Sequence, residues 1–434
     1  MSRQRKIKGE SQPKADRKLG PGIEAVREVK LPEIATEYLP GGSPVHYIKT
    51  PSAPVVQLEI AVDAGRLKER APLVSRASAA LLKDATLRYS REEIASIADR
   101  TGGTINIQAG LEYASIQIYC LEEQVDILLD LARDMLLFPL YRPEDLRKYV
   151  RKRKSRLKRD LTVNEVLGYR KLTEMIFGPT HPYGYNSTAE LYDALEDTQL
   201  SHFHREHYRT GNMQVFLCCR NPGHILRKLE RIWSGLEGGR SEDRQFELQP
   251  FRATFAEVAA VKKGQASIKM GLGMFPRKHP DFAGIYFLNT LLGGFFGSRL
   301  IHLIRESEGL AYSVFSSVET FRTSGFFVVG CETSSYRATR VIDLVLSELQ
   351  RLKTEQVTEE EILLVKNYLF GLFTSMLDGP LNTMELLKGL ITEGAGIPSF
   401  YRMMDDFREM DAARISALAQ QYFKVEEMKT VLVR

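Results

Sequence analysis

The chain has 434 residues, of which 43% are hydrophobic and 26% charged, a composition typical of a globular protein with two or three domains. Its formal net charge of +5 is small for this length and therefore gives no support to a role in nucleic-acid or membrane-surface binding. The cysteines Cys120, Cys218, Cys219 and Cys331 form no CxxC pair and no disulfide framework, so we expect reduced, buried thiols.

The N-terminus differs in composition from the rest of the chain. Residues 1–30 are polar, rich in Lys and Arg, and carry Pro13, Gly20, Pro21 and Gly22, which predicts a disordered basic arm. This arm lacks the apolar segment of a secretory signal, and no apolar run in the chain approaches the roughly 18 residues that a membrane span needs. We therefore expect a cytoplasmic protein with no membrane span.

Strand and helix patterns alternate from residue 55 to about residue 160. Ser90 and Glu93 form a capping box for a helix that ends near Arg100, and apolar residues at helical spacing between Val125 and Leu136 predict a helix packed on a sheet. In chain order we expect a strand at 55–62, a helix from Pro72, the capped helix, strands at 105–110 and 113–121, the apolar helix, and a long, very basic helix that begins near Pro143.

The same order of elements repeats after a polar stretch at 238–243. A strand at 266–274 precedes an apolar helix, two further strands, and a helix with apolar residues at 341–352; Thr358 and Glu361 then cap the next helix. The repeat predicts an α+β fold with two homologous domains, 31–238 and 244–434, each an antiparallel or mixed sheet backed by helices.

The most specific segment is 291–317, LLGGFFGSRLIHLIRESEGLAYSVFSS, in which glycines interrupt an apolar helix and a second short helix ends at Gly309. This segment resembles the C-terminal domain of the insulinase/pitrilysin metallopeptidase family, in its processing-peptidase-like branch. In that family an Arg and a Tyr seven positions apart reach over the bound peptide, and Arg305 and Tyr312 have this spacing. The resemblance therefore implies that Arg305 and Tyr312 bind substrate.

The chemistry of the two side chains agrees with that role, because a guanidinium and a phenol can both donate hydrogen bonds to a substrate carbonyl and to the oxyanion formed from it. The structural alternative is that Arg305 pairs with Glu306 or Glu308 on a helix surface while Tyr312 fills a core. The surrounding Gly-Ser-Arg-Leu and Gly-Leu-Ala-Tyr-Ser context favours substrate binding.

The resemblance covers nearly the whole chain, because AGRLKERAPL, YSREEIASIADRTGG and HPYGYNSTAEL also look like family segments in their usual order. In active members the helix after the first segment carries HxxEH, with two zinc-binding histidines and a glutamate base. Here the alignment places Arg76 and Ala80 at the histidine positions and Ala79 at the glutamate position. The third zinc ligand, a Glu about 75 residues further on, falls near Ser155 or Arg156, so the resemblance implies a degenerate site without metal.

A separate histidine cluster occurs in SHFHREHY, residues 201–208. It misses HxxEH by one position, because Phe203 rather than a histidine precedes His207 by four residues. A zinc site at His204 and His207 remains the minor alternative, and a surface helix is favoured.

The basic run 147–159, RKYVRKRKSRLKR, leaves several interpretations open. A fully solvated helix is the simplest of them. The others are a contact with the acidic face of a partner subunit and a positively charged wall that attracts acidic peptides, while nucleic acid is the least favoured.

The resemblance implies a zinc-less subunit that binds peptide, has no cofactor and is inactive alone. Paired with an HxxEH-bearing paralogue as a heterodimer, it would complete a metalloendopeptidase site whose zinc is bound by the partner. The alternatives are a purely structural or peptide-binding scaffold and an active homodimeric zinc peptidase. We expect no nucleic-acid partner.

Overall fold

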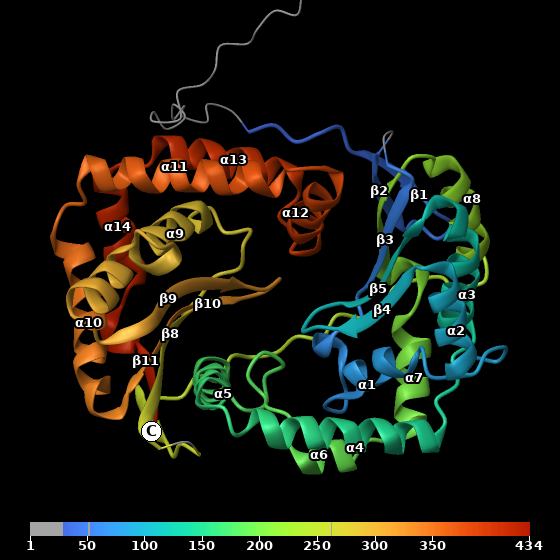
Figure 1. Cartoon of the computed structure of the whole chain (residues 1–434), viewed down its shortest axis with the longest axis horizontal. Helices are drawn as coiled ribbons and strands as arrows, with labels where there is room; N and C mark the ends of the chain where they lie inside the picture. Colours follow the sequence, from blue (N-terminus) through green and yellow to red (C-terminus); the bar gives the residue numbers. More distant parts are fainter. Residues whose placement is uncertain (1–28, 51–52, 262) are drawn as a thin grey trace, which may run out of the picture.

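The computed structural model describes residues 29–50, 53–261 and 263–434. The predicted basic arm, residues 1–30, lies outside this range except for its last two residues, and Val29 is already buried against the core. The chain forms two halves, each with its own sheet and helices, which lie beside each other in Figure 1. This confirms the predicted α+β architecture.

The first half is built on a mixed sheet with the strand order β1-β2-β6-β3-β5-β4, in which only the pairing of β2 with β6 is parallel. Its strands are β1 (Ala35–Tyr38), β2 (Pro44–Lys49), β3 (Val55–Val62), β4 (Thr104–Ala109), β5 (Ala114–Leu121) and β6 (Met213–Cys219). Its helices are α1 (Val74–Leu81), α2 (Arg91–Thr101), α3 (Val125–Leu137), α4 (Pro143–Asp160), α5 (Asn164–Phe177), α6 (Ala189–Asp193), α7 (Asp197–His207) and α8 (Pro222–Trp233).

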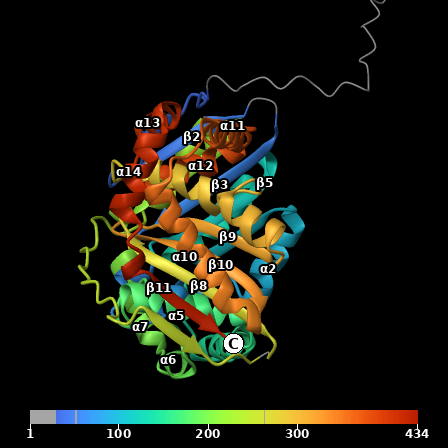
Figure 2. The ribbon, with the colours of Figure 1, turned by 90° about the vertical axis from the view of Figure 1, so that its left-hand side faces the viewer.

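The second half has the order β7-β11-β8-β10-β9, with only β7 and β11 parallel, and Figure 2 shows α10 and α14 in front of this sheet. Its strands are β7 (Phe255–Val258), β8 (Gln265–Met274), β9 (Ala311–Thr320), β10 (Gly325–Ser334) and β11 (Lys429–Val433). Its helices are α9 (Phe282–Asn289), α10 (Ala338–Thr354), α11 (Glu359–Met376), α12 (Pro380–Thr392), α13 (Ile397–Glu409) and α14 (Ala412–Tyr422), with π-helical segments at Thr290–Gly294 and Ile301–Ser307.

Local sequence signals explain where several helices begin. Both predicted capping boxes are present: Ser90 and Glu93 exchange side-chain and backbone hydrogen bonds at the start of α2, and Thr358 and Glu361 do the same for α11. Pro143 occupies the first turn of α4, where its missing N–H has no helical partner to lose.

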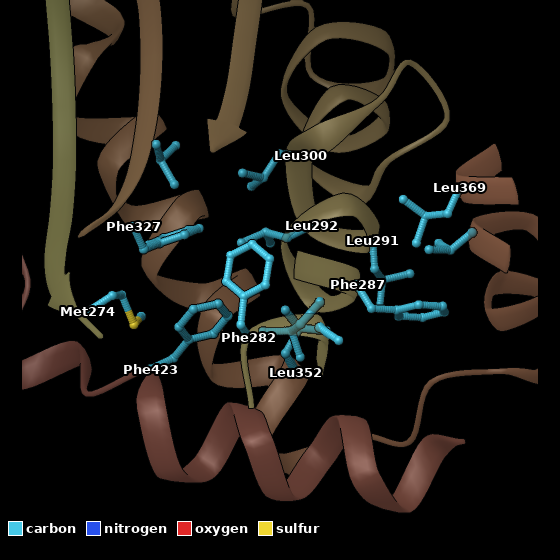
Figure 3. Packing of buried hydrophobic residues seen from close by; sticks show 14 of the residues in the cluster. Met274, Phe282, Phe287, Leu291, Leu292, Leu300, Phe327, Leu352, Leu369 and Phe423 are labelled. Atoms are coloured by element: carbon cyan, nitrogen blue, oxygen red, sulfur yellow. The ribbon is translucent and has the colours of Figure 1, made fainter. Parts of the chain in front are cut away.

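Aromatic and aliphatic side chains fill the core of the second half. Figure 3 shows Phe282 and Phe287 of α9 among leucines from neighbouring elements, with Phe327 of β10 beside Phe423 at a centroid distance of 4.9 Å. All four cysteines are free and buried, and burial raises the pKa of Cys218 to about 12, so this thiol stays protonated near neutral pH. In the described part of the chain, no helix is both long enough and apolar enough to cross a bilayer.

Each half covers the other half's sheet with one of its helices. Helix α5, from the first half of the sequence, packs on β8 and β11, where Phe177 joins a buried cluster with Phe326 and Val328. Helix α12, from the second half, packs on β2 and β6 of the first sheet, and Lys388 bonds to Glu59 at 2.8 Å. The exchange fastens the two halves together, and no sequence pattern predicted it.

Buried polar contacts add a second link between the halves. Asp63, at the end of β3, accepts two hydrogen bonds from the Arg322 guanidinium at 3.1 and 3.3 Å. Glu112 accepts hydrogen bonds from the Tyr183 hydroxyl and from the backbone N–H of Arg322, at 2.5 and 2.7 Å. The turn between β9 and β10 is thereby tied to the first sheet.

Candidate functional site

The segment with Arg305 and Tyr312 is shaped by two glycines. A side chain at Gly293 would come within 2.7 Å of the Ser316 backbone nitrogen, so only glycine lets the π-helical turn lie against β9. Gly309 has φ +58°, a left-handed conformation that turns the chain from the Ile301–Ser307 segment into β9. The two turns set the positions of Arg305 and Tyr312.

Arg305 lies between two exposed aromatic rings. Its guanidinium carbon is 5.0 Å from the centroid of the Tyr312 ring and 5.2 Å from that of Phe296, distances typical of cation–π contacts. Tyr312 is 86% exposed and Phe296 is 65% exposed. Since large aromatic side chains are usually buried, a pair presented in this way is available to a ligand.

The structural alternative for this pair does not hold. Glu306 binds His302 at 3.0 Å and Glu308 binds Arg340 at 3.0 Å, so both carboxylates offered as partners of Arg305 are engaged elsewhere. The high exposure of Tyr312 excludes a core role for its ring.

The degenerate zinc positions lie in the first half, on the short helix α1. The buried carboxylate of Glu69 holds the start of this helix by accepting hydrogen bonds from the Ser75 backbone N–H at 3.0 Å and from its hydroxyl at 2.5 Å. Tyr185 donates a hydrogen bond to the same carboxylate and accepts one from the N–H of Leu73, which has a left-handed φ of 71°. Burial raises the pKa of Glu69, while the bonds from Ser75 and Tyr185 oppose that shift.

Arg76 and Ala80 lie one turn apart and line the same cavity, of about 510 Å³, which we name the α1 cavity. Its other charged lining residues are Arg153 and Arg156 of α4, Asp160 at the end of α4, and Arg170 of α5. Of the two positions considered for the third ligand, Arg156 lines this cavity, whereas Ser155 lines a different one on the other side of α4. Ala79 is buried in the core and faces away from it.

These residues do not fit a zinc ion. Guanidinium groups and a methyl group offer no lone pair to a metal, and positive charge repels a divalent cation. Asp160, the one carboxylate among the described residues that line the α1 cavity, lies 3.6 Å from Arg156. No group of three or more His, Cys, Asp or Glu side chains placed to hold a metal occurs within 29–50, 53–261 and 263–434.

The edge strand β4 borders the α1 cavity. It pairs with β5 on one side only, and Ile107, Gln108 and Ala109 are lining residues. Outward-pointing backbone groups of an edge strand can pair with an added extended segment. The structure does not bring the two predicted site groups together within one half: Arg305 and Tyr312 belong to the second half, and Arg76 and Ala80 to the first. The elements β9 and α1 lie in different halves in Figure 1.

Sequence reasoning missed part of this cavity. Arg170 carried no local signal, because α5 was not distinguished as a separate element. Arg153 and Arg156 fell in the basic run 147–159, for which a fully solvated helix was the simplest interpretation. That interpretation is wrong, because Tyr149 and Leu157 are buried and Arg153 and Arg156 line the cavity.

The histidines of α7 are structural. The expected surface helix is only half exposed: it packs on α1, with His204 and His207 buried and His202 exposed. His204 stacks on Tyr208 and His207 lies against Phe203, each at a centroid distance of 4.4 Å. Burial lowers the pKa of His204 to about 3 and that of His207 to about 4.

These low pKa values predict acid destabilisation. In the unfolded chain both groups take up protons near their ordinary pKa of 6.5, whereas the folded chain resists protonation until about pH 4 or below. Their contribution to stability is complete above pH 6.5 and is lost as the pH falls towards 4, with a slope of about 1.4 kcal/mol per pH unit for each group.

We expect His207→Gln to lower this slope between pH 4.5 and 6 by about 1.4 kcal/mol per pH unit, which corresponds to one proton. Urea unfolding measures the slope, with the single tryptophan, Trp233, as the fluorescent reporter. His202→Gln, on the exposed side of the same helix, is the control for the replacement of a histidine by glutamine. Equal slopes for wild type and His207→Gln would contradict the prediction.

Comparisons with known proteins agree with the architecture. The family described as "Peptidase M16 inactive domain" matches residues 194–369. The chain is similar to an "uncharacterized zinc protease" of Bacillus subtilis, at 23% identity over 78% of this chain and 82% of that protein. A protein of the same description from Mycobacterium leprae is 25% identical over 88% of both chains.

Solved structures show the same fold. The peptidase M16 inactive domain from Pseudomonas fluorescens superposes with a TM-score of 0.85 at 20% identity, covering 92% of this chain and 98% of the other. A protease from Helicobacter pylori gives a TM-score of 0.83 at 16% identity, covering 93% and 100%. The two sheets, the Arg305–Tyr312 contact next to the start of β9, and the position of α1 fit these matches: the chain is similar to peptidase M16 proteins over residues 194–369 by its family model and over most of its length by its fold.

Proposed function

We propose that this chain is a peptide-binding subunit that does not hydrolyse peptides alone. Paired with an HxxEH-bearing paralogue, it completes a metalloendopeptidase site to which Arg305 and Tyr312 contribute hydrogen-bond donors and the partner contributes zinc. The reaction class is peptide hydrolysis, in which donors placed over the scissile carbonyl stabilise the developing oxyanion.

The observation that carries the proposal is the arrangement of Arg305 and Tyr312. The guanidinium is held against the exposed phenol at 5.0 Å, and among the described residues no carboxylate pairs with it. An arginine fixed by an aromatic ring but free of an ion pair keeps its N–H donors available. We assign the metal chemistry to another chain, because the α1 cavity offers arginines where zinc needs ligands.

Reconstitution tests the proposal. The purified chain and an HxxEH-bearing paralogue, each inactive alone on a quenched fluorescent peptide, should cleave it when mixed. Cleavage should stop when a chelator is added, and it should depend on Arg305. An unchanged rate with Arg305→Ala would remove the proposed role of the pair.

A scaffold that binds peptide without assisting catalysis is the second candidate. The open edge of β4 favours it, since an extended peptide can add there without any metal. This candidate predicts peptide binding but no partner-dependent cleavage, so the same mixing experiment separates the two.

An active homodimeric zinc peptidase is the third candidate, and metal analysis separates it from the other two. After dialysis against zinc and gel filtration, we expect well below one zinc per chain. The matched variant Arg76→His/Ala80→His/Arg156→Glu installs two imidazoles and one carboxylate around the α1 cavity and should bind zinc more tightly than wild type. Stoichiometric zinc in the wild-type chain would contradict the proposal of a zinc-less subunit and favour the homodimeric zinc peptidase.

A further inference from the structure

The α1 cavity is continuous with a second basic cavity, of about 550 Å³, which we name the α4 cavity. The two share Ala80, Ile107, Arg153 and Arg156 as lining residues. Together they are lined by nine cationic side chains and only two carboxylates, although the whole chain carries a net charge of only +5. Positive charge is therefore concentrated where active relatives would bind a cation.

Much of this charge is not neutralised within the chain. Both carboxylates are already engaged, Asp160 with Arg156 at 3.6 Å and Asp84 with Arg91 at 3.5 Å. Arg76 and Arg153 form no ion pair with any described residue, and Arg153 rests on the ring of Tyr149 at 5.1 Å.

Neighbouring arginines also repel each other at this site. Burial lowers the pKa of Arg66, and the charge of Arg76 lowers it further. Burial also lowers the pKa of Arg170, and the charge of Arg66 lowers it further. The carboxylate of Glu69 opposes the shift of Arg66, and those of Asp160 and Glu174 oppose the shift of Arg170, but both pKa values stay lowered, so an added anion would relieve the remaining repulsion.

A buried hydroxyl also lacks a partner here. Tyr149 lines the α4 cavity, is 8% exposed, and its hydroxyl has no hydrogen-bond partner in the described part of the chain. Buried polar groups are normally satisfied, so this hydroxyl is an unused donor in the cavity wall, although almost none of its surface is accessible.

Strand β4 indicates what kind of anion enters. Ile107, Gln108 and Ala109 place the open edge of the sheet beside the arginines of α4. A segment paired with this edge directs alternate side chains towards one face, so acidic residues at every second position can reach the guanidinium groups together.

We infer that the α1 and α4 cavities bind the acidic side chains of an extended peptide whose backbone pairs with β4. The degenerate metal site is thus a selectivity site in which carboxylates of the ligand occupy the place of zinc. Arginine suits this role because its planar N–H groups match a carboxylate bidentately. The inference rests on the proposed function only in taking the ligand to be a peptide.

Fluorescence anisotropy on the full chain tests the inference. We compare labelled 12-residue peptides with Glu, Gln or Lys at alternate positions of one otherwise identical sequence. At low salt the Glu peptide should bind at least about 10-fold more tightly than the Gln peptide, and added NaCl should reduce this preference. Arg153→Gln/Arg156→Gln should lower the preference to less than about 3-fold.

The matched control is Arg147→Gln/Arg151→Gln, which removes the same two charges from the same helix. Both control arginines are exposed and line neither basic cavity, so the preference should persist. If both double variants lose the preference for the Glu peptide equally, the preference comes from general charge attraction and the proposed site is wrong. Equal affinity for Glu and Gln peptides, or no peptide binding, would overturn it as well.

Two further results would reassign the cavities. If tripolyphosphate binds and the Glu peptide does not, the ligand is a free phosphate compound and not a peptide. If Arg153→Gln/Arg156→Gln weakens association with the HxxEH-bearing subunit without changing peptide preference, the basic face contacts a partner. If peptides bind equally well whatever their charge, the inference fails but the proposed function stands. If Arg305→Ala leaves reconstituted cleavage unchanged, the proposed function fails but the preference for acidic peptides stands. The two failures are therefore distinguishable.

Discussion

Replacing Arg305 with Ala should lower kcat/KM of the reconstituted peptidase by about 10²- to 10³-fold, the usual effect of losing one oxyanion donor and equivalent to about 2.7–4 kcal/mol. The guanidinium is held by the Tyr312 and Phe296 rings at 5.0 and 5.2 Å, so its donors need little reorganisation when the transition state forms. Arg305→Lys keeps the charge but loses the planar fork, so only part of the activity should return.

The variant Tyr312→Phe distinguishes the contribution of the Tyr312 hydroxyl from that of its ring. The variant keeps the surface on which Arg305 rests but loses a donor, so kcat should fall while Arg305 stays in place. Arg402 supplies the matched control, because it is an exposed arginine in the same half that lies on α13 and not in the segment with Arg305 and Tyr312. Arg402→Ala should leave kcat/KM unchanged. An equal loss in this control would assign the effect of Arg305→Ala to general surface charge.

Asp63→Ala should lower the free energy of unfolding by about 3–5 kcal/mol, the usual cost of removing one partner from a buried ion pair. Asp63 is buried, and its carboxylate accepts hydrogen bonds from both terminal nitrogens of Arg322, which belongs to the other half, at 3.1 and 3.3 Å. It also lies 3.5 Å from the ammonium group of Lys68, which is itself buried. Its loss therefore leaves the Arg322 guanidinium without its ion-pair partner at the junction of the halves, whereas Lys68 keeps Asp243 at 2.7 Å.

Urea unfolding at pH 7 measures this effect, and a double-variant cycle isolates the pair. Asp63→Ala/Arg322→Ala should cost clearly less than the sum of the two single variants, because each single variant leaves the other charge unpaired. Asp343→Ala removes an exposed carboxylate of α10 and should change stability by no more than about 0.5 kcal/mol. Additive single effects would show that the pair does not couple the halves.

The elements were predictable because their signals are local. Strand-like segments predicted β3, β5 and β10, apolar stripes predicted α3 and α10, and two capping boxes predicted the starts of α2 and α11. The repeated order of these elements predicted the two-half architecture. The Arg305–Tyr312 contact was also accessible, because both residues lie within one short segment whose turns are fixed by glycines.

The burial of particular side chains, and the contacts between elements that lie far apart in the sequence, were not predictable in this way. The sequence places His204 and His207 on a polar helix, and only the packing of α7 on α1 buries them. Nor does any local pattern state that α5 covers the second sheet and α12 the first, because both helices are amphipathic and either sheet offers an apolar face.

The sequence by itself determined the fold class, the Arg-Tyr spacing and the absence of zinc-binding side chains at positions 76, 79 and 80, because each depends on residue identity or short-range order. Only the tertiary structure decided that Arg76, Arg153 and Arg170, from α1, α4 and α5, face one cavity beside the open edge of β4. Such a gathering of charge depends on long-range packing, which brings together helices that are far apart along the chain.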